Sequence, residues 1–231
     1  MKTIGMIGGM SWESTAEYYR IVNQKVKERL GGLHSAKCVM FSVDFHEIET
    51  LQDQNQWDEA GRLMADAAEN VEKGGADFFI ICTNTMHKVA DFVQQHVRIP
   101  LLHIADPTAK KIKAEAIQKI ALLGTRFTMM EDFYKGKLVR DHGLEVIIPS
   151  DAEMDIIHKV IYDELCLGII NDASRDQYAE IIDHLVKKGA EGVILGCTEI
   201  GLLIKNVDSQ IPVFDTTVIH AEAAVDYALA I

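Results

Sequence analysis

Short runs of apolar, mostly β-branched residues alternate along the whole chain with longer stretches in which apolar residues recur at helical spacing. This alternation predicts an α/β protein with parallel sheets, because two parallel strands are usually connected by a helix. In such sheets, ligands bind beyond the carboxyl ends of the strands. The expected strands are the runs 4–7, 38–43, 77–82, 100–104, 119–123, 145–148, 192–195 and 211–214. The expected helices are the stretches 13–29, 56–74, 85–96, 151–167, 173–189 and 218–230.

The charge of the chain argues against two classes of partner. Its 231 residues carry a formal net charge of -12 and no stripe rich in Lys and Arg. We therefore expect neither a nucleic-acid partner nor binding to an anionic membrane. The N-terminal stretch lacks the long apolar segment of a signal peptide, and no apolar run approaches the roughly 20 residues of a spanning helix. These features predict a cytoplasmic protein whose four cysteines are free thiols.

The sequence predicts no metal and no cofactor. The stretch DFHEIE brings Asp44, His46 and Glu47 close together, but no second cluster completes a coordination sphere. We interpret these residues as a loop and helix start with solvated charges. The glycines of IGMIGGM lack the G-x-G-x-x-G spacing of a dinucleotide site, and no lysine has the signature of a pyridoxal phosphate Schiff base.

Three pairs of segments indicate that the chain repeats itself. IGMIGGM is similar to IALLGTR, FFIICTNT to GVILGCTE, and IPLLHIAD to IPVFDTTV. This alignment places residues 80–84 over residues 194–198, so that Thr83, not Cys82, corresponds to Cys197. Adjacent residues at a strand end point to opposite faces, and we therefore expect Cys82 to pack inward. The alternative, in which an irregular strand end turns Cys82 toward the ligand, stays open.

Both of these strand ends precede apolar residues at helical spacing. Thr83 and Thr85 are therefore candidate caps of one helix, and Cys197 lies at the start of another. Free N–H groups at a helix start attract anions, and they can lower the pKa of a thiol from ~8.5 toward ~3.5 to 7.5. We predict that Cys197 supplies a thiolate near neutral pH. Cys38 and Cys166 are interpreted as structural cysteines.

Five segments, in order along the chain, resemble the aspartate/glutamate racemases that work without pyridoxal phosphate. The resemblance covers the whole chain and implies two similar α/β lobes, each a short parallel sheet flanked by helices, with the active site in the cleft between them. We place the lobes at 1–99 plus 212–231 and at 100–211. The resemblance also implies a homodimer. The five segments are IGMIGGMSWEST, CTNTMHKVAD, LLGTRFTM, GVILGCTEIGLL and VFDTTVIHAEAAV.

The family pattern places one cysteine just before the first Asn-Thr and another within Gly-Cys-Thr. The second is present here as Cys197, whereas Thr83 replaces the first. Racemisation at Cα needs a base on one face and an acid on the other. The resemblance therefore implies that Cys197 takes the proton from the L enantiomer and that Thr83, or alternatively Cys82, lies at the opposite face. Because a hydroxyl is a weaker base than a thiolate, we predict an enzyme that removes the α-proton faster from the L enantiomer than from the D enantiomer.

The remaining motif residues are expected to surround the substrate with backbone and hydroxyl donors. Glu199 could accept from a substrate ammonium group while amides hold the carboxylate, and this combination favours an amino acid, above all aspartate or glutamate. Arg126 is a candidate partner for a distal carboxylate, and equally a surface or subunit-contact residue. The expected substrate-binding residues are Met10, Ser11, Gln52, Asn84, Thr85, Thr125, Thr198 and Glu199.

Two other functions stay open at this point. Maleate isomerases, arylmalonate decarboxylases and hydantoin racemases belong to the same superfamily, resemble this chain, and use the same cleft for other substrates. The replaced cysteine also leaves open a catalytically silent amino-acid-binding protein or sensor, which would bind its ligand without turnover.

Overall fold

The computed structural model describes residues 1–230, whose helices and strands form two compact units. The first unit comprises Met1–Ile104 together with the segment that starts at His220, and the second comprises Ala105–Ile219. Each change of unit lies a few residues after the boundary expected from the sequence. Within the described residues, no helix is both long enough and apolar enough to cross a membrane.

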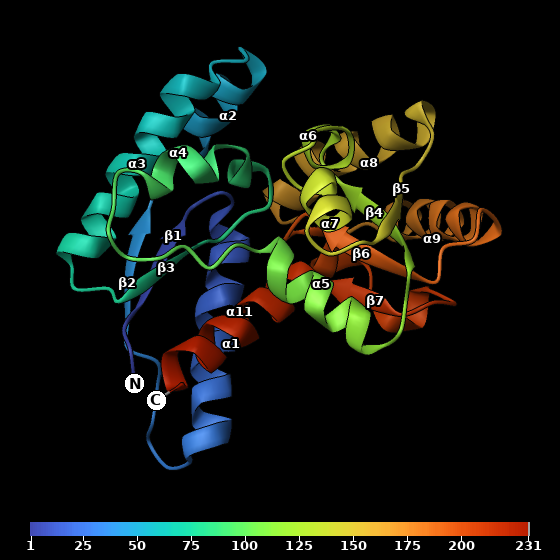
Figure 1. Ribbon diagram of the computed structural model, residues 1–231. Coiled ribbons are helices and arrows are strands. Elements are labelled where there is room, and N and C mark those ends of the chain that lie inside the picture. Colours follow the sequence, from blue (N-terminus) through green and yellow to red (C-terminus); the bar gives the residue numbers. More distant parts are fainter. Residues whose placement is uncertain (231) are drawn as a thin grey trace. The chain divides into compact units, whose positions relative to one another are not determined.

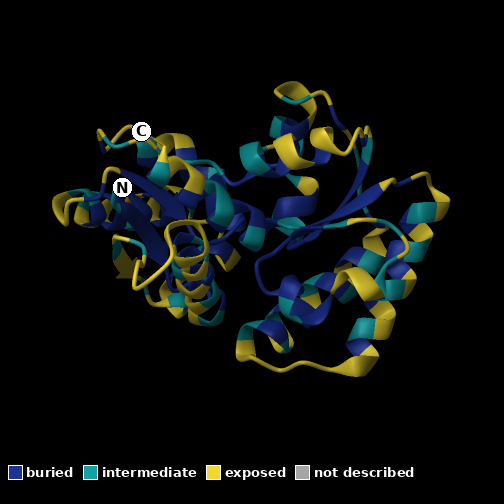
Figure 2. Cartoon of the chain, turned by 90° about the horizontal axis from the view of Figure 1, so that it is seen from below, coloured by how far each residue is buried: buried dark blue, intermediate teal, exposed yellow. Residues whose placement is uncertain are grey.

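The first unit is built on a three-stranded parallel sheet in the order β2-β1-β3. The central strand β1 is buried along its whole length. In Figure 2, strands inside the chain have the dark blue of buried residues. Helices α2 and α3 lie together beside this sheet (Figure 1), and α3 faces β1 and β2. The elements are β1 (Ile4–Gly8), α1 (Trp12–Leu30), β2 (Cys38–Ser42), α2 (Phe45–Asp53), α3 (Trp57–Lys73), β3 (Phe78–Ile81), the 3-10 helix η1 (Thr85–Val89), α4 (Ala90–Gln94) and most of α11 (Thr216–Leu229).

Helix α3 illustrates why these residues form a helix that covers a sheet. Its buried residues recur at spacings of three and four, which places them on one face, and most of them are small. Small side chains let the helix approach the strands closely. The buried residues are Ala60, Gly61, Met64, Ala65, Ala67, Ala68 and Val71.

The second unit is built on a four-stranded parallel sheet in the order β5-β4-β6-β7. Its central strands β4 and β6 are almost entirely buried. The elements are α5 (Ala105–Ala114), β4 (Lys119–Gly124), α6 (Arg126–Met130), α7 (Lys135–Arg140), β5 (Glu145–Ile147), α8 (Asp151–Asp163), η2 (Leu165–Leu167), α9 (Asp172–Lys187), β6 (Gly192–Gly196), α10 (Ile200–Leu203), η3 (Asn206–Asp208) and β7 (Val213–Asp215).

Parallel sheets flanked by helices confirm the predicted fold class. The expected strand 100–104 is wrong, because only a single bridge joins Leu101 to Phe79. The expected helix 85–96 begins as a 3-10 helix rather than an α-helix. Among the short helices, only the starts of α2 and α10 were expected, and α5, α6 and α7 were not predicted, because segments of four to ten residues carry too few helical repeats to reveal a period.

The two units repeat one hydrogen-bonding scheme. The amide of Phe79 donates to the carbonyl of Pro100 at 3.0 Å, and the amide of Val193 donates to the carbonyl of Pro212 at 2.9 Å. These contacts explain the later unit boundaries, since residues 100–102 stay with β3 while β7 completes the second sheet.

The strand register gives the same alignment of the halves as the sequence. Ile7 of β1 pairs with Ile81 of β3, and Leu123 of β4 pairs with Leu195 of β6. Because IGMIGGM aligns with IALLGTR, Ile7 corresponds to Leu123, and Ile81 therefore corresponds to Leu195. Two residues further on, Thr83 corresponds to Cys197.

Candidate functional site

In the second unit, the carboxyl end of β6 carries a buried thiol, that of Cys197. Strands β4 and β6 approach closely where Gly124 pairs with Gly196. A Cβ atom added to Gly196 would lie 2.7 Å from the carbonyl oxygen of Leu123, so that only glycine fits there without a shift of the strands. Cys197 follows directly and is 8% exposed. The close approach of β4 and β6 at Gly196 therefore fixes the position of Cys197 at the end of β6.

The Cys197 thiol lies in a small hydrogen-bonded cluster of adjacent residues. Its Sγ donates to Oε2 of Glu199 at 3.0 Å, and the hydroxyl of Thr198 donates to the same oxygen at 2.9 Å. The Glu199 carboxylate is only 2% exposed. A carboxylate that accepts from a buried thiol is positioned to receive the thiol proton.

The environment of Cys197 corrects one expectation from the sequence. Burial, and then the neighbouring Glu199 carboxylate, raise the pKa of the Cys197 thiol well above its usual value. The expected lowering by a helix start is wrong because α10 has only four residues, and an acidic group lies beside the thiol. The thiol is therefore protonated at neutral pH in the unliganded protein.

Hydroxyl groups surround this strand end. Thr125 follows β4 at the same sheet edge and caps α6 through its side chain, which accepts from the amide of Thr128 at 3.3 Å. On the β7 side, the hydroxyl of Thr216 donates to the carbonyl of Leu195 at 2.8 Å, and Thr217 donates to that of Thr198 at 3.4 Å. Thr216 and Thr217, which begin α11 directly after β7, were missed by the sequence analysis, although DTT follows a predicted strand.

Arg126 lies beside this edge but is engaged elsewhere in the second unit. Its guanidinium forms an ion pair with Asp155 and lies 3.5 Å from a carboxylate oxygen of Asp151. About one third of the Arg126 side chain is exposed. These contacts therefore support the interpretation of Arg126 as a surface residue better than that of a partner for a substrate carboxylate.

In the first unit, the carboxyl end of β3 carries the residues equivalent to the thiol site. Cys82 is fully buried, and burial raises the pKa of its thiol, whereas Thr83 is 9% exposed. Asn84 and Thr85 are buried beside them. The predicted capping by Thr83 or Thr85 is wrong, because the residue at the N-cap of η1 is Asn84 and no side-chain hydrogen bond caps this short helix.

Three further predicted residues lie in the first unit. Met10 belongs to the same buried cluster as Met86 of η1, and the side-chain amide of Gln52 donates to the Met86 sulfur at 3.1 Å. Ser11 caps α1, because its hydroxyl accepts from the amide of Ser14 at 3.4 Å. The β1 end, α2 and the β3 end are thereby tied together. In the second unit, Thr125, Cys197, Thr198 and Glu199 lie at one sheet edge.

Comparison with known proteins identifies the chain's family. The family model described as Asp/Glu/Hydantoin racemase matches residues 7–224. The chain belongs to this family. As a member it is an isomerase of the amino-acid racemase type.

Individual relatives agree with this assignment. A broad-specificity amino-acid racemase from Bacillus subtilis is 30% identical over 238 residues, which cover 98% of each chain. The solved structure of a proposed Asp/Glu racemase from Yersinia pestis is 55% identical over 100% of both chains, with a TM-score of 0.92. That of an aspartate racemase homologue from Pyrococcus horikoshii is 34% identical over 100% of both chains, with a TM-score of 0.85.

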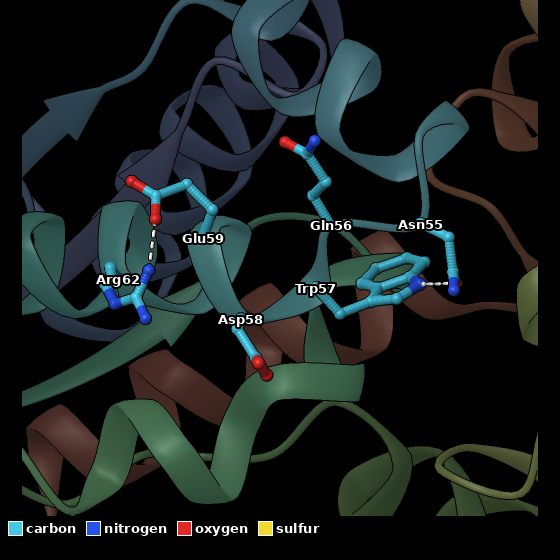
Figure 3. Close-up of a pocket in the computed structure, with 6 residues that line it drawn as sticks. All are labelled: Asn55, Gln56, Trp57, Asp58, Glu59 and Arg62. Atoms are coloured by element: carbon cyan, nitrogen blue, oxygen red, sulfur yellow. Dashed lines mark hydrogen bonds and ion pairs between the residues drawn. The ribbon is translucent and has the colours of Figure 1, made fainter.

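A polar surface hollow of this racemase has no residue of either strand end in its lining. It has a volume of about 520 Å³ and is lined by the loop between α2 and α3 and the start of α3 (Figure 3). Its polar groups pair with one another, since the Trp57 indole donates to Asn55 at 2.8 Å and Arg62 pairs with Glu59. We therefore assign it no role in the reaction. Among the described residues, no group of three or more His, Cys, Asp and Glu side chains could hold a metal ion.

A cluster of two buried histidines and one half-buried histidine was also missed. His87 lies four residues after Thr83, and its Nδ1 lies 2.8 Å from the Thr83 carbonyl oxygen. The rings of His103 and His220 lie 4.5 and 6.0 Å from the His87 ring, centroid to centroid. The spacing of His87 from Thr83, one helical turn, was the signal in the sequence that could have revealed it.

Proposed function

We propose that the chain racemises an amino acid at Cα without a cofactor, with aspartate and glutamate as the favoured substrates. Cys197 acts as the base toward the L enantiomer, and Thr83 acts at the opposite face of Cα. The names of the relatives support this substrate class, since one is a broad-specificity amino-acid racemase and another an aspartate racemase homologue. We further propose a homodimer of two-lobed subunits, as the sequence resemblance implies.

The hydrogen bond from the Cys197 thiol to Glu199 is the observation that carries the proposal. In the first step, the thiol proton passes to the Glu199 carboxylate. The resulting thiolate then takes the α-proton of the L substrate, and the electron pair of the broken C–H bond delocalises into the substrate carboxylate. Backbone and hydroxyl donors stabilise this charge, and the proposed donors are Met10, Ser11, Gln52, Asn84, Thr85, Thr125 and Thr198.

The second step completes inversion. The Thr83 hydroxyl gives its proton to the opposite face of the carbanion and regains a proton from solvent, while the protonated Glu199 releases its proton to solvent, so that both ends of the site return to their starting protonation. In the reverse direction the same hydroxyl would have to remove an α-proton, for which it is a poor base. The proposed enzyme therefore handles L substrates faster than D substrates.

Deuterated water provides the direct test. Purified protein is incubated separately with L- and D-aspartate and L- and D-glutamate without added cofactor, and the loss of the Cα proton signal is followed by NMR. The expected result is exchange and D-product formation from an L substrate, with slower initial exchange from its enantiomer. Binding of an amino acid without any exchange would contradict the proposal and favour the sensor function.

Replacement of the carboxylate tests the proton acceptor. Glu199→Gln removes a negative charge beside the thiol, so the thiol should titrate at a lower pH than in the wild type. Exchange from the L substrate should nevertheless fall by roughly 10²-fold or more, because the proton acceptor is lost. Thiolate absorbance and Cα exchange are measured together.

The matched control is Glu164→Gln. Glu164 lies in the same unit and accepts from Ser174 at 2.7 Å, far in sequence from the proposed base. This variant should leave both the titration and the exchange unchanged. A Glu199→Gln variant with full exchange would eliminate Glu199 as the acceptor.

A further inference from the structure

The His87 imidazole joins two main-chain segments of the first unit. Its Nδ1 lies 2.8 Å from the carbonyl oxygen of Thr83, and the amide of Ile104 donates to its Nε2 at 3.2 Å. A carbonyl oxygen only accepts and an amide N–H only donates. Nδ1 therefore carries the hydrogen and Nε2 does not, so both contacts require one neutral tautomer.

A second imidazole, that of His220, binds the same main-chain segment. The Nε2 of His220 lies 2.8 Å from the carbonyl oxygen of Leu102, and its Nδ1 lies 3.0 Å from the hydroxyl of Tyr18 in α1. His220 is fully buried and His87 is 3% exposed. The segment 102–104, which binds His87, is thus itself bound by His220 of α11, and His220 in turn contacts Tyr18 of α1. These side chains together hold the Thr83 carbonyl in place inside the first unit.

The second unit holds its equivalent carbonyl in another way. The carbonyl of Cys197 accepts from the main-chain amide of Ile200 at 3.1 Å. The residue equivalent to His87 is Gly201, and a Cβ atom there would lie 2.2 Å from the Asp215 carboxylate. Because Gly201 has no side chain, no imidazole stands at this position in the second unit.

We propose that His87 is a positioning residue for racemisation: by binding the Thr83 carbonyl, it fixes the main chain so that the Thr83 hydroxyl is aimed at Cα. This inference rests on the proposed function, in which Thr83 delivers the proton that inverts the substrate. A hydroxyl is a weak acid, and its efficiency depends on alignment. A displacement of about 1 Å can cost roughly 10²-fold in rate.

Two substitutions separate the two hydrogen bonds of His87. His87→Asn places an amide N–H near the position of Nδ1 and can keep the bond to the Thr83 carbonyl. His87→Gln reaches the position of Nε2, so its amide oxygen can keep the bond from Ile104 while the bond to Thr83 is lost. The pair is matched, because each variant removes one of the two contacts from the same buried position.

The test uses the full-length protein with L-aspartate and L-glutamate as probes in deuterated water. Two quantities are measured: D-product formation and deuterium exchange into the remaining L substrate, which needs Cys197 and its acceptor Glu199 but not Thr83. We expect His87→Gln to lower the ratio of D product to L exchange by roughly ten-fold or more, and His87→Asn to keep it within about three-fold of the wild type.

Several outcomes would overturn the role of His87. Equal losses of both quantities in the two variants would indicate a purely structural residue. An unchanged ratio in a folded His87→Gln protein would do the same. If the wild type exchanges no α-proton at all, the proposed racemisation itself fails, and this outcome is distinct because it appears before any substitution is made.

A spectroscopic measurement covers the case in which a variant does not fold. ¹⁵N NMR of the wild-type imidazoles at pH 7 should assign to His87 the neutral form protonated at Nδ1. A charged ring, or one protonated at Nε2, cannot bind the Thr83 carbonyl and the Ile104 amide together, and would refute the proposal.

Discussion

The carboxyl ends of β3 and β6 share one backbone frame but differ in chemistry. At the end of β6, Cys197 binds a buried carboxylate two residues further along the chain. At the end of β3, the equivalent Thr83 has its carbonyl bound by His87. The repeated halves thus supply equivalent positions, while the side chains around these positions differ. The fold is symmetric in outline, and the proposed chemistry is not.

The largest expected effect comes from removal of the thiol. Cys197→Ala should reduce exchange from L-aspartate or L-glutamate by about 10²- to 10⁴-fold, the usual contribution of a general base. Cys38→Ala is the control, because Cys38 lies on β2 and is half-buried. The Cα exchange rates of the two folded variants are measured by NMR and compared with that of the wild type. Substantial activity without Cys197 would mean that the base is misassigned.

The next largest effect is expected from a substitution that makes the ends of β3 and β6 alike. Thr83→Cys places a second thiol at the position equivalent to Cys197, so initial exchange from a D substrate should rise, by roughly ten-fold or more. The comparison is between initial rates for the two enantiomers, since the equilibrium itself cannot change.

Cys82→Ala is the control for this substitution. Cys82 is fully buried, so its truncation should cost about 1 to 3 kcal/mol of unfolding free energy while the ratio of D to L exchange stays the same. Abolished D-directed exchange in a folded Cys82→Ala protein, together with a mild Thr83→Ala, would reverse the assignment.

A smaller effect concerns stability at the β3 end. Burial, and then the nearby His103 and His220 rings, lower the pKa of His87 well below its usual value. The unfolded chain therefore binds a proton below about pH 6.5 that the folded chain does not, so His87 destabilises the fold as pH falls. The loss should reach about 1 kcal/mol by pH 5.5.

Denaturant unfolding of the wild type and His87→Asn at several pH values measures this difference. The variant should lose less stability between pH 7 and pH 5.5 than the wild type, because it lacks the titrating ring. Parallel pH dependences would indicate that His87 has the same pKa in the folded and the unfolded chain. The corresponding β6 end has no histidine, so no such dependence is expected from it.

The smallest effect is expected for Arg126. Its ion pairs with Asp151 and Asp155 are partly exposed, and such pairs contribute about 0 to 1 kcal/mol. Arg126→Gln should therefore change the turnover of all substrates slightly and equally. A selective loss of aspartate and glutamate turnover, relative to neutral amino acids, would instead identify Arg126 as a substrate contact.

The sequence predicted the architecture well because its signals are local and periodic. Strands β1 and β6 and helices α1 and α3 lie within one or two residues of their predicted bounds. The internal alignment also predicted that Thr83 corresponds to Cys197, which the strand pairing supports independently. The predicted strand at 100–104 failed because its apolar composition does not reveal that only Leu101 pairs.

The electrostatics of the site could not be predicted in the same way. Glu199 was expected to contact a substrate ammonium group, and its distance to the Cys197 thiol depends on the turn after β6. The raised thiol pKa follows from that contact and from burial. The His87 and His220 network joins residues far apart in sequence, such as Tyr18 and His220, so no local pattern announces it.

The close approach of β4 and β6 at Gly196 restricts how such an enzyme could be redesigned. In the second unit, a side chain one residue before the thiol would meet the main chain of Leu123, so the reactive group cannot be moved back along β6. In the first unit, the equivalent position already accommodates the Cys82 side chain. New chemistry can therefore be introduced by substitution at residues 82 and 83, while the glycine before Cys197 has to be kept.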